Sequence, residues 1–236
     1  MQILPDFKLL QPATLAEAIA ARRAHPTARL LAGGTDMIAN LRRGIGTPSD
    51  LIDVTAIGEL GDITMVDGAL RIGAAVTLAA LIDDARLRAV PIIAEAAKTI
   101  AGPSHREVAT VGGNLCLDTR CVFYNQSEWW RASNDFCRKY KGTVCHVAPT
   151  GNRCHAAYSG DLAPALLVLG AEAELAGADG ARRVPLNQLY ADDGEAHLRL
   201  QPGEILVAVH VRPDASLRAD YAKARLRGAI DFPLAG

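Results

Sequence analysis

The residues best suited to chemistry in this chain are concentrated between Cys116 and Tyr158. This stretch holds all five cysteines and seven of the eleven aromatic residues of a 236-residue chain. Elsewhere the sequence is rich in Ala, Leu, Gly and Val, which indicates that the stretch has its own role within a host fold. Four of the cysteines are separated by 15, 7 and 8 residues, namely Cys121, Cys137, Cys145 and Cys154.

Three kinds of cysteine chemistry are compatible with this pattern. Disulfides are disfavoured because the N-terminus has neither the basic nor the apolar region of an export signal. Zinc favours Cys-x-x-Cys pairs, which are absent, although Cys145-His146 and Cys154-His155 offer mixed ligands. An iron–sulfur cluster needs four thiolates and accepts varied spacings. The spacing alone therefore leaves zinc and an iron–sulfur cluster open.

Two glycine pairs are candidates for binding an anion. Gly33-Gly34-Thr35 follows a predicted buried strand and precedes a predicted helix, and Thr110–Asn114 repeats the arrangement with Gly112-Gly113. Glycines let the backbone approach a phosphate, and the free N–H groups at a helix start point towards it. Neither pair matches the P-loop or the dinucleotide fingerprint. Together they predict a diphosphate cofactor held between two parts of one domain.

Alternating helices and hairpins favour an α+β fold over a regular parallel α/β sheet. Thr14 with Glu17 forms a capping box for a helix that His25-Pro26 ends. Gly-containing turns predict two hairpins. The strands are expected within residues 7–10, 29–32, 51–54, 63–65, 69–72, 171–175, 182–184, 205–211 and 223–226. The helices are expected within residues 14–20, 35–41, 74–84, 89–100 and 186–190.

Composition and charge exclude several classes of protein. Half of the residues are hydrophobic, the net charge is −1, and no apolar run approaches the length of a membrane span. We expect a cytoplasmic protein with no nucleic-acid or membrane partner. Residues 117–158, hereafter the cysteine-rich segment, carry six basic residues against three acidic ones. That excess fits either an ordinary solvated loop or a docking surface for an acidic partner, at Arg138, Lys139 and Lys141.

Five short motifs stand in the order found in one family. They are Leu31–Asp36, Thr110–Asn114, Asp161–Ala165, Glu204–Leu206 and Tyr221–Lys223. Together they resemble the FAD-binding medium subunit of molybdenum hydroxylases, the xanthine and carbon monoxide dehydrogenase family. The resemblance implies that two glycine loops, Leu30–Met37 and Thr110–Asn114, wrap the FAD diphosphate. It implies the following cofactor-binding residues: Leu30, Leu31, Ala32, Gly33, Gly34, Thr35, Asp36, Met37, Thr110, Val111, Gly112, Gly113, Asn114, Asp161, Leu206 and Lys223.

The cysteine-rich segment sets this chain apart from most members of that family, which have only a few residues at this place. It is similar to the loop that carries an extra [4Fe–4S] cluster in the 4-hydroxybenzoyl-CoA reductase branch. That likeness implies Cys121, Cys137, Cys145 and Cys154 as cluster ligands. Cys116 follows the second glycine loop directly and is predicted to be a small buried residue of the host fold. The resemblance also implies a FAD-binding domain over residues 1–224 and the start of a truncated C-terminal domain over residues 225–236.

By this resemblance the chain is an electron-transfer subunit without catalytic residues of its own. Reductive dehydroxylation to benzoyl-CoA would occur at a molybdenum cofactor on a large subunit, with [2Fe–2S] clusters on a small subunit and ferredoxin as donor. A dimer of heterotrimers is implied. One alternative is a FAD subunit of an aromatic or purine hydroxylase that passes electrons to NAD or a quinone, its loop braced by zinc or a cluster. Another is a flavin-free scaffold subunit in which the glycine pairs are only turns.

Overall fold

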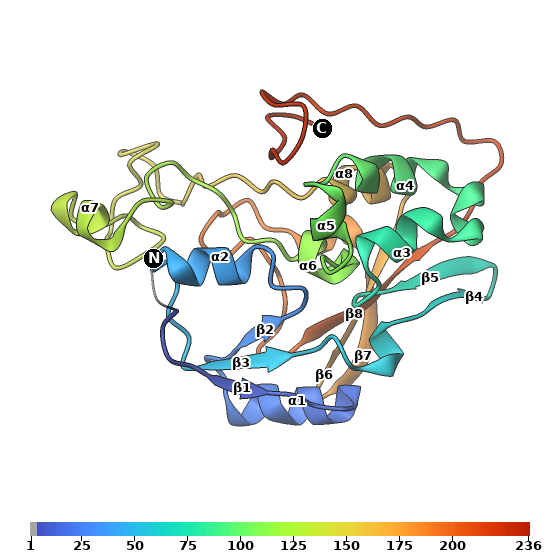
Figure 1. The fold of residues 1–236 in the computed structure, drawn as a ribbon, viewed down its shortest axis with the longest axis horizontal. Coiled ribbons are helices and arrows are strands. Elements are labelled where there is room, and N and C mark those ends of the chain that lie inside the picture. Colours follow the sequence, from blue (N-terminus) through green and yellow to red (C-terminus); the bar gives the residue numbers. More distant parts are fainter. Residues whose placement is uncertain (1–3) are drawn as a thin grey trace.

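The computed structural model describes residues 4–236, and the strands in it form two separate sheets (Figure 1). The smaller sheet has three strands in the order β1-β3-β2, and both strand pairs are parallel. Parallel strands require crossover connections, and here α1 and α2 supply them. The elements are β1 (Lys8–Leu10), α1 (Leu15–Ala24), β2 (Arg29–Leu31), α2 (Met37–Arg42) and β3 (Asp50–Asp53).

The larger sheet has five antiparallel strands in the order β4-β5-β8-β6-β7. Its central strand β8 is buried at every position, as expected for a strand covered on both faces. The register between β6 and β8 shifts at Glu174 and Leu175. The strands are β4 (Ile63–Val66), β5 (Ala69–Gly73), β6 (Glu172–Gly177), β7 (Gly180–Pro185) and β8 (Ile205–Val211).

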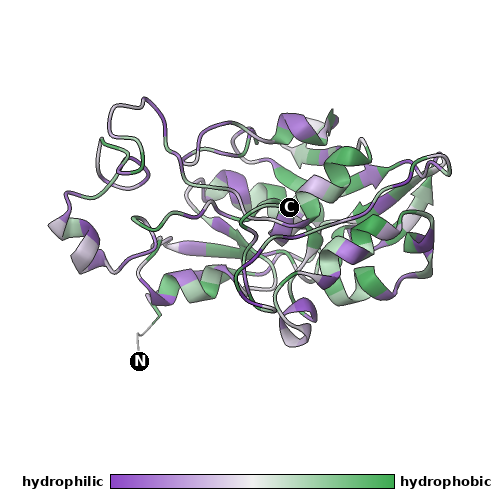
Figure 2. Ribbon diagram, turned by 90° about the horizontal axis from the view of Figure 1, so that it is seen from above, coloured by the Kyte–Doolittle hydropathy of each residue, from purple (hydrophilic) through white to green (hydrophobic). Residues whose placement is uncertain are grey.

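Helices cover one side of the larger sheet and enclose the main core (Figure 1). Apolar side chains of α3, α4, α6 and α8 pack there against β5, β6 and β8. In Figure 2 hydrophobic colouring runs along these helices and strands. The helices are α3 (Leu78–Asp83), α4 (Pro91–Lys98), α5 (Pro103–Arg106), α6 (Val111–Leu115) and α8 (Leu162–Val168). Short 3-10 helices are η1 (Gly58–Leu60), η2 (Ala85–Ala89) and η3 (Leu186–Leu189).

A second apolar cluster joins the two sheets. Ala18 of α1 and Ile52 of β3 pack there with Ile205 and Val207 of β8. The cysteine-rich segment lies outside both sheets and has one helix, α7 (Glu128–Ser133), at the far end of the molecule from β4 and β5 (Figure 1). No helix within residues 4–236 is long and apolar enough to cross a membrane.

Most local predictions from the sequence are confirmed. Thr14 caps α1 by accepting a hydrogen bond from the Glu17 N–H at 3.2 Å, and both hairpins form. The helix expected from residue 74 begins only at Leu78, because the Ala74 and Val76 carbonyls accept hydrogen bonds from the Gly112 and Val111 N–H groups at 2.8 and 2.9 Å and not from a following helical turn. The strand expected at residues 223–226 is wrong, since Ala224 makes only an isolated bridge to Ala235.

Candidate functional site

The two glycine loops, far apart in the sequence, lie against each other in the structure. A Cβ atom added at Gly33 would lie 1.8 Å from the carbonyl oxygen of Val108, just before the second loop. A Cβ atom added at Gly113 would lie 3.9 Å from the Cβ atom of Ala32 in the first loop. Glycine is therefore required at position 33 for the two backbones to approach this closely.

The first glycine loop presents unused hydrogen-bond donors. Gly34 has a φ of +69°, a left-handed conformation that turns the chain from β2 towards α2. The backbone N–H groups of Gly33, Gly34, Thr35 and Asp36 donate to no residue between 4 and 236. Asp36 precedes α2, yet its carboxylate makes no capping hydrogen bond. Successive free N–H groups at a turn form a concave site for an anion, and they fit the oxygens of a diphosphate.

The second glycine loop differs from the expected turn, because its glycines lie inside α6. The Gly112 N–H donates to the Ala74 carbonyl at 2.8 Å, and the Gly113 N–H donates to Thr110 Oγ1 at 3.0 Å. Thr110 acts as the helix N-cap, which sequence reasoning missed. These two donors are occupied, so this loop offers the exposed surface of Gly113 instead of a row of free N–H groups.

Asp161 is connected to both the second loop and the C-terminal part of the chain. The backbone N–H of Leu162 donates to Asn114 Oδ1 at 3.0 Å, which ties α8 to the second loop. The Asp161 carboxylate makes a buried ion pair with Lys223 at 3.0 Å and accepts a hydrogen bond from the Tyr221 hydroxyl at 2.9 Å. Desolvation, with Asp161 nearby, raises the pKa of Tyr221. Because Asp161 and Lys223 form this ion pair, their charges neutralise each other inside the protein.

The remaining predicted cofactor residues are distributed around these loops. Leu30 and Leu31 belong to β2, Ala32 follows it, and Met37 begins α2. Val111 is buried at the start of α6. Leu206 lies within the main core on β8, opposite Leu175 of β6.

The four cysteines predicted as metal ligands are free thiols. Cys137, Cys145 and Cys154 are buried, and Cys121 is partly buried. The N–H of Ala156 donates to Cys154 Sγ at 3.4 Å. Burial raises the pKa of Cys154, and the nearby Cys145 and Cys121 thiols also raise it. As they stand, no three His, Cys, Asp or Glu side chains among residues 4–236 form a group that could hold a metal ion.

The pKa of Cys145 is shifted in the opposite direction from that of Cys154. Burial opposes the thiolate there, but backbone hydrogen bonds from His155, Ala148 and Val147 outweigh it, so the pKa of Cys145 is lowered. Cys116, by contrast, is enclosed by apolar surroundings, and burial raises its pKa to about 12. A thiol with such a raised pKa stays protonated and inert, which distinguishes Cys116 from Cys145.

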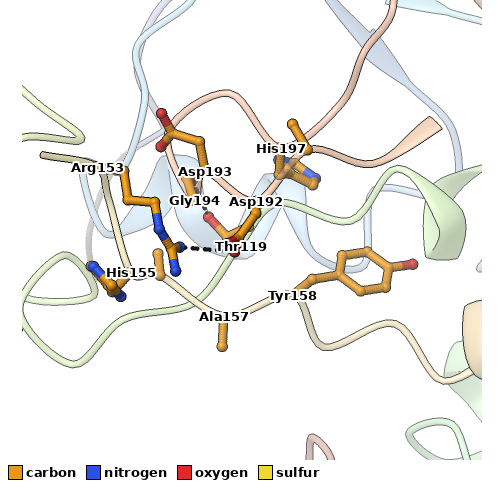
Figure 3. Close-up of a pocket in the computed structure, with 11 residues that line it drawn as sticks. Thr119, Arg153, His155, Ala157, Tyr158, Asp192, Asp193, Gly194 and His197 are labelled. Carbon is orange, nitrogen blue, oxygen red and sulfur yellow. Dashed lines mark hydrogen bonds and ion pairs between the residues drawn. The ribbon is translucent and has the colours of Figure 1, made fainter. Parts of the chain in front are cut away.

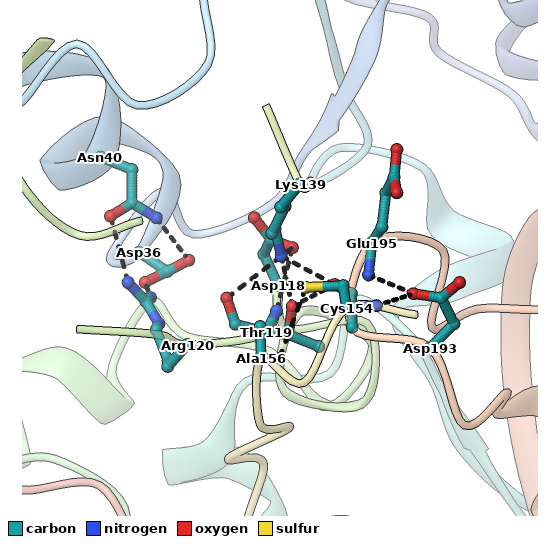
Figure 4. A network of polar contacts seen from close by, with 11 residues as sticks. Asp36, Asn40, Asp118, Thr119, Arg120, Lys139, Cys154, Ala156, Asp193 and Glu195 are labelled. Carbon is teal, nitrogen blue, oxygen red and sulfur yellow. Dashed lines mark hydrogen bonds and ion pairs between the residues drawn. The ribbon is translucent and has the colours of Figure 1, made fainter. Parts of the chain in front are cut away.

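A buried lysine braces the cysteine-rich segment. The Lys139 side chain is 6% exposed, and its ammonium group contacts Asp118 Oδ1 at 2.8 Å and the Gly194 carbonyl at 3.0 Å (Figure 4). The prediction that Lys139 belongs to an exposed basic surface is therefore wrong. Arg131 is likewise buried and donates to the Gly44 carbonyl at 2.6 Å, beyond the C-terminus of α2. Lys141 is exposed but paired with Glu128.

A cavity of about 270 Å³ lies between the end of the cysteine-rich segment and the loop after η3 (Figure 3). Arg153 and Asp192 form an ion pair of 2.8 Å at its edge, and His197 lines its inner side. Neither glycine loop contributes to its lining. Tyr158 borders the cavity and donates from its hydroxyl to the Asn114 carbonyl at 2.9 Å, which links this region to the second loop.

Comparison with known proteins agrees with this arrangement of loops and sheets. Residues 5–213 match the family described as the FAD binding domain in molybdopterin dehydrogenase. The xanthine dehydrogenase FAD-binding subunit of Escherichia coli O157:H7 is 32% identical over 228 residues, which is 95% of this chain and 64% of that subunit. The carbon monoxide dehydrogenase medium chain of Afipia carboxidovorans is 30% identical over 227 residues, which is 95% of this chain and 65% of that one.

Solved structures resemble this one over nearly its whole length. Reconstituted carbon monoxide dehydrogenase from Oligotropha carboxidovorans matches with a TM-score of 0.73 at 28% identity, over 98% of this chain and 68% of that one. Quinoline 2-oxidoreductase from Pseudomonas putida 86 shares the fold, with a TM-score of 0.73 at 24% identity over 97% of this chain and 67% of that one. The chain belongs to the FAD-binding subunit family of the molybdenum hydroxylases.

Proposed function

We propose that this chain transfers electrons through FAD and a [4Fe–4S] cluster, as part of a molybdenum enzyme of the 4-hydroxybenzoyl-CoA reductase type. The observation that carries the FAD half is the row of free N–H groups at Gly33–Asp36, which fits a diphosphate. In this proposal the two glycine loops hold the cofactor, and Asp161, Leu206 and Lys223 support its surroundings. Bound FAD exchanges electrons in pairs or singly, so it can connect two-electron and one-electron carriers.

The cysteine-rich segment supports the cluster half of the proposal. Cys121, Cys137, Cys145 and Cys154 are free thiols of the cysteine-rich segment, and three of them are buried. Hydrogen bonds from the backbone to the sulfurs, as at Cys154, are a common feature that tunes iron–sulfur clusters. A small segment outside both sheets also gains stability from a metal staple, because the metal replaces a hydrophobic core.

Partners follow from the same proposal. A large subunit would hold the molybdenum cofactor, a small subunit would hold [2Fe–2S] clusters, and ferredoxin would supply electrons to the [4Fe–4S] cluster. The assembly would be a dimer of heterotrimers. The cysteine-rich segment suits a protein contact because large apolar side chains are exposed on it, including Trp129 at 76% exposure, Val122 and Val147. Charge contributes less than expected, since five of the six basic side chains there are paired.

A second candidate function is favoured by the relatives. The similar proteins include a xanthine dehydrogenase FAD-binding subunit and a carbon monoxide dehydrogenase medium chain. A hydroxylase subunit of that kind would pass electrons outward to NAD or a quinone, and zinc or a structural cluster would brace the cysteine-rich segment. A cluster that stays oxidised when the FAD of the same protein is reduced would favour this second function.

Replacing Cys137 with serine tests the cluster assignment. We expect the Cys137→Ser protein to lose its iron and its broad visible absorbance, since a cluster requires all four thiolates, while it keeps FAD. Cys116→Ala is the matched control, because that thiol is protonated and belongs to the host fold. Metal analysis and the flavin absorption bands of both purified proteins provide the measurement. Unchanged iron in the Cys137→Ser protein would remove Cys137 from the ligand set.

A further inference from the structure

Arg120 connects the cysteine-rich segment to the first glycine loop. Its backbone is fixed by two hydrogen bonds to Ala157, with the Arg120 N–H donating at 2.7 Å and the Ala157 N–H donating at 2.8 Å. Its side chain is 13% exposed and makes an ion pair with the Asp36 carboxylate (Figure 4). The guanidinium also donates to Asn40 Oδ1 at 3.2 Å and lies 4.9 Å from the centre of the Phe232 ring. The position of this cation is therefore set from several sides.

Asp36 creates an electrostatic problem for an anion at the first glycine loop. Its N–H is one of the free donors, but its side chain places a carboxylate on the same residue. An uncompensated carboxylate would repel a diphosphate, and partial burial would reduce the screening of that repulsion by water. Asn40 donates to Asp36 Oδ2 at 3.0 Å, but a neutral amide leaves the charge in place. Within residues 4–236, Arg120 is the cation paired with this carboxylate.

We propose that Arg120 is a positioning residue of the FAD site, which neutralises Asp36 so that the first glycine loop can accept the diphosphate. This inference rests on the proposed FAD site and extends it, because the cysteine-rich segment then supplies part of the flavin site.

A double-mutant cycle on the full chain tests this role. FAD is titrated into flavin-depleted protein, and the quenching of flavin fluorescence reports the dissociation constant. We expect Arg120→Met to weaken FAD binding by about tenfold or more, because Asp36 then carries an unpaired charge. Asp36→Asn alone should bind FAD at least as tightly as the wild type. The double variant Arg120→Met with Asp36→Asn should recover most of the lost affinity, and added salt should reduce the defect of Arg120→Met.

The control variant is Arg153→Met, which removes another arginine of the cysteine-rich segment, paired with Asp192 at the cavity and away from the glycine loops. It should leave FAD affinity unchanged. Iron content and circular dichroism of every variant establish that the segment remains folded. Wild-type affinity in the Arg120→Met protein would overturn the inference. A double variant that binds FAD as weakly as Arg120→Met would also overturn the inference. Arg120 would then act only by holding α2 in place, and not by neutralising Asp36. A wild-type chain that binds no FAD would overturn the proposed function instead.

Discussion

Replacing Gly33 with alanine should abolish tight FAD binding. The added Cβ atom would lie 1.8 Å from the Val108 carbonyl oxygen and 2.4 Å from its carbonyl carbon. Both are backbone atoms, so no side chain can rotate to make room, and the two glycine loops must separate. We expect FAD affinity to fall by about a hundredfold or more, because a diphosphate held between two loops needs both in place. The free energy of unfolding should fall by about 1–3 kcal/mol, as for other overpacked sites.

Gly58→Ala is the matched control for this substitution. A Cβ atom at Gly58 would meet no atom within 4 Å, and Gly58 does not have a positive φ. Fluorescence titration with FAD and urea denaturation of both variants provide the two measurements. Equal FAD affinity in Gly33→Ala and Gly58→Ala would show that contact between the loops is not needed for flavin binding.

Replacing Asp161 with alanine should be among the most destabilising changes in the chain. The side chains of Lys223 and Asp161 are 2% and 3% exposed, so the variant leaves an ammonium group buried with the Thr99 carbonyl at 3.2 Å as its remaining partner. Breaking a buried ion pair by removing one partner costs about 3–5 kcal/mol of unfolding free energy. Urea denaturation measures this loss directly. The Tyr221 hydroxyl, which donates to Asp161, also loses its acceptor.

Removing both charges separates the ion pair from general packing. The double variant Asp161→Leu with Lys223→Met should be much closer to the wild type, because apolar replacements of both partners avoid the unpaired charge. Arg227→Met serves as a control, since the Arg227–Asp231 pair is at the surface and its loss should cost far less than breaking the buried pair. An Asp161→Ala protein as stable as the Arg227→Met protein would contradict the assigned role of the buried pair.

The elements predicted correctly are those determined by neighbours in sequence. The Thr14 N-cap of α1 and the Asp67-Gly68 turn depend on residues a few positions apart, so the sequence pattern is sufficient to predict them. The second half of the capping box differs, because the Glu17 carboxylate accepts from the Ala13 N–H and not from that of Thr14. The first glycine loop was likewise recognisable, because a buried strand, a glycine pair and a helix follow one another directly. These local signals also carried the family resemblance, which the match over residues 5–213 confirms.

The features that could not be predicted depend on contacts between distant residues. The sequence predicts that Lys139 is exposed, but its side chain is buried and contacts Asp118 and Gly194, and no pattern around Lys139 indicates this pairing. Residues 223–226 have the apolar and basic composition of an edge strand, yet Lys223 turns inward to Asp161. Arg120 stands in no motif, and its link to Asp36 follows only from the folded cysteine-rich segment.

The most direct test of the central proposal is the cofactor content of the wild-type chain, purified without oxygen together with any partner subunits. Flavin, iron, zinc and acid-labile sulfide are measured per copy of this chain, and iron held by separated partner subunits is subtracted. We expect one FAD with roughly four iron and four sulfide ions, the content of a [4Fe–4S] cluster. Flavin accompanied by zinc, or by no metal in this chain, would contradict the account of electron transfer through the cysteine-rich segment.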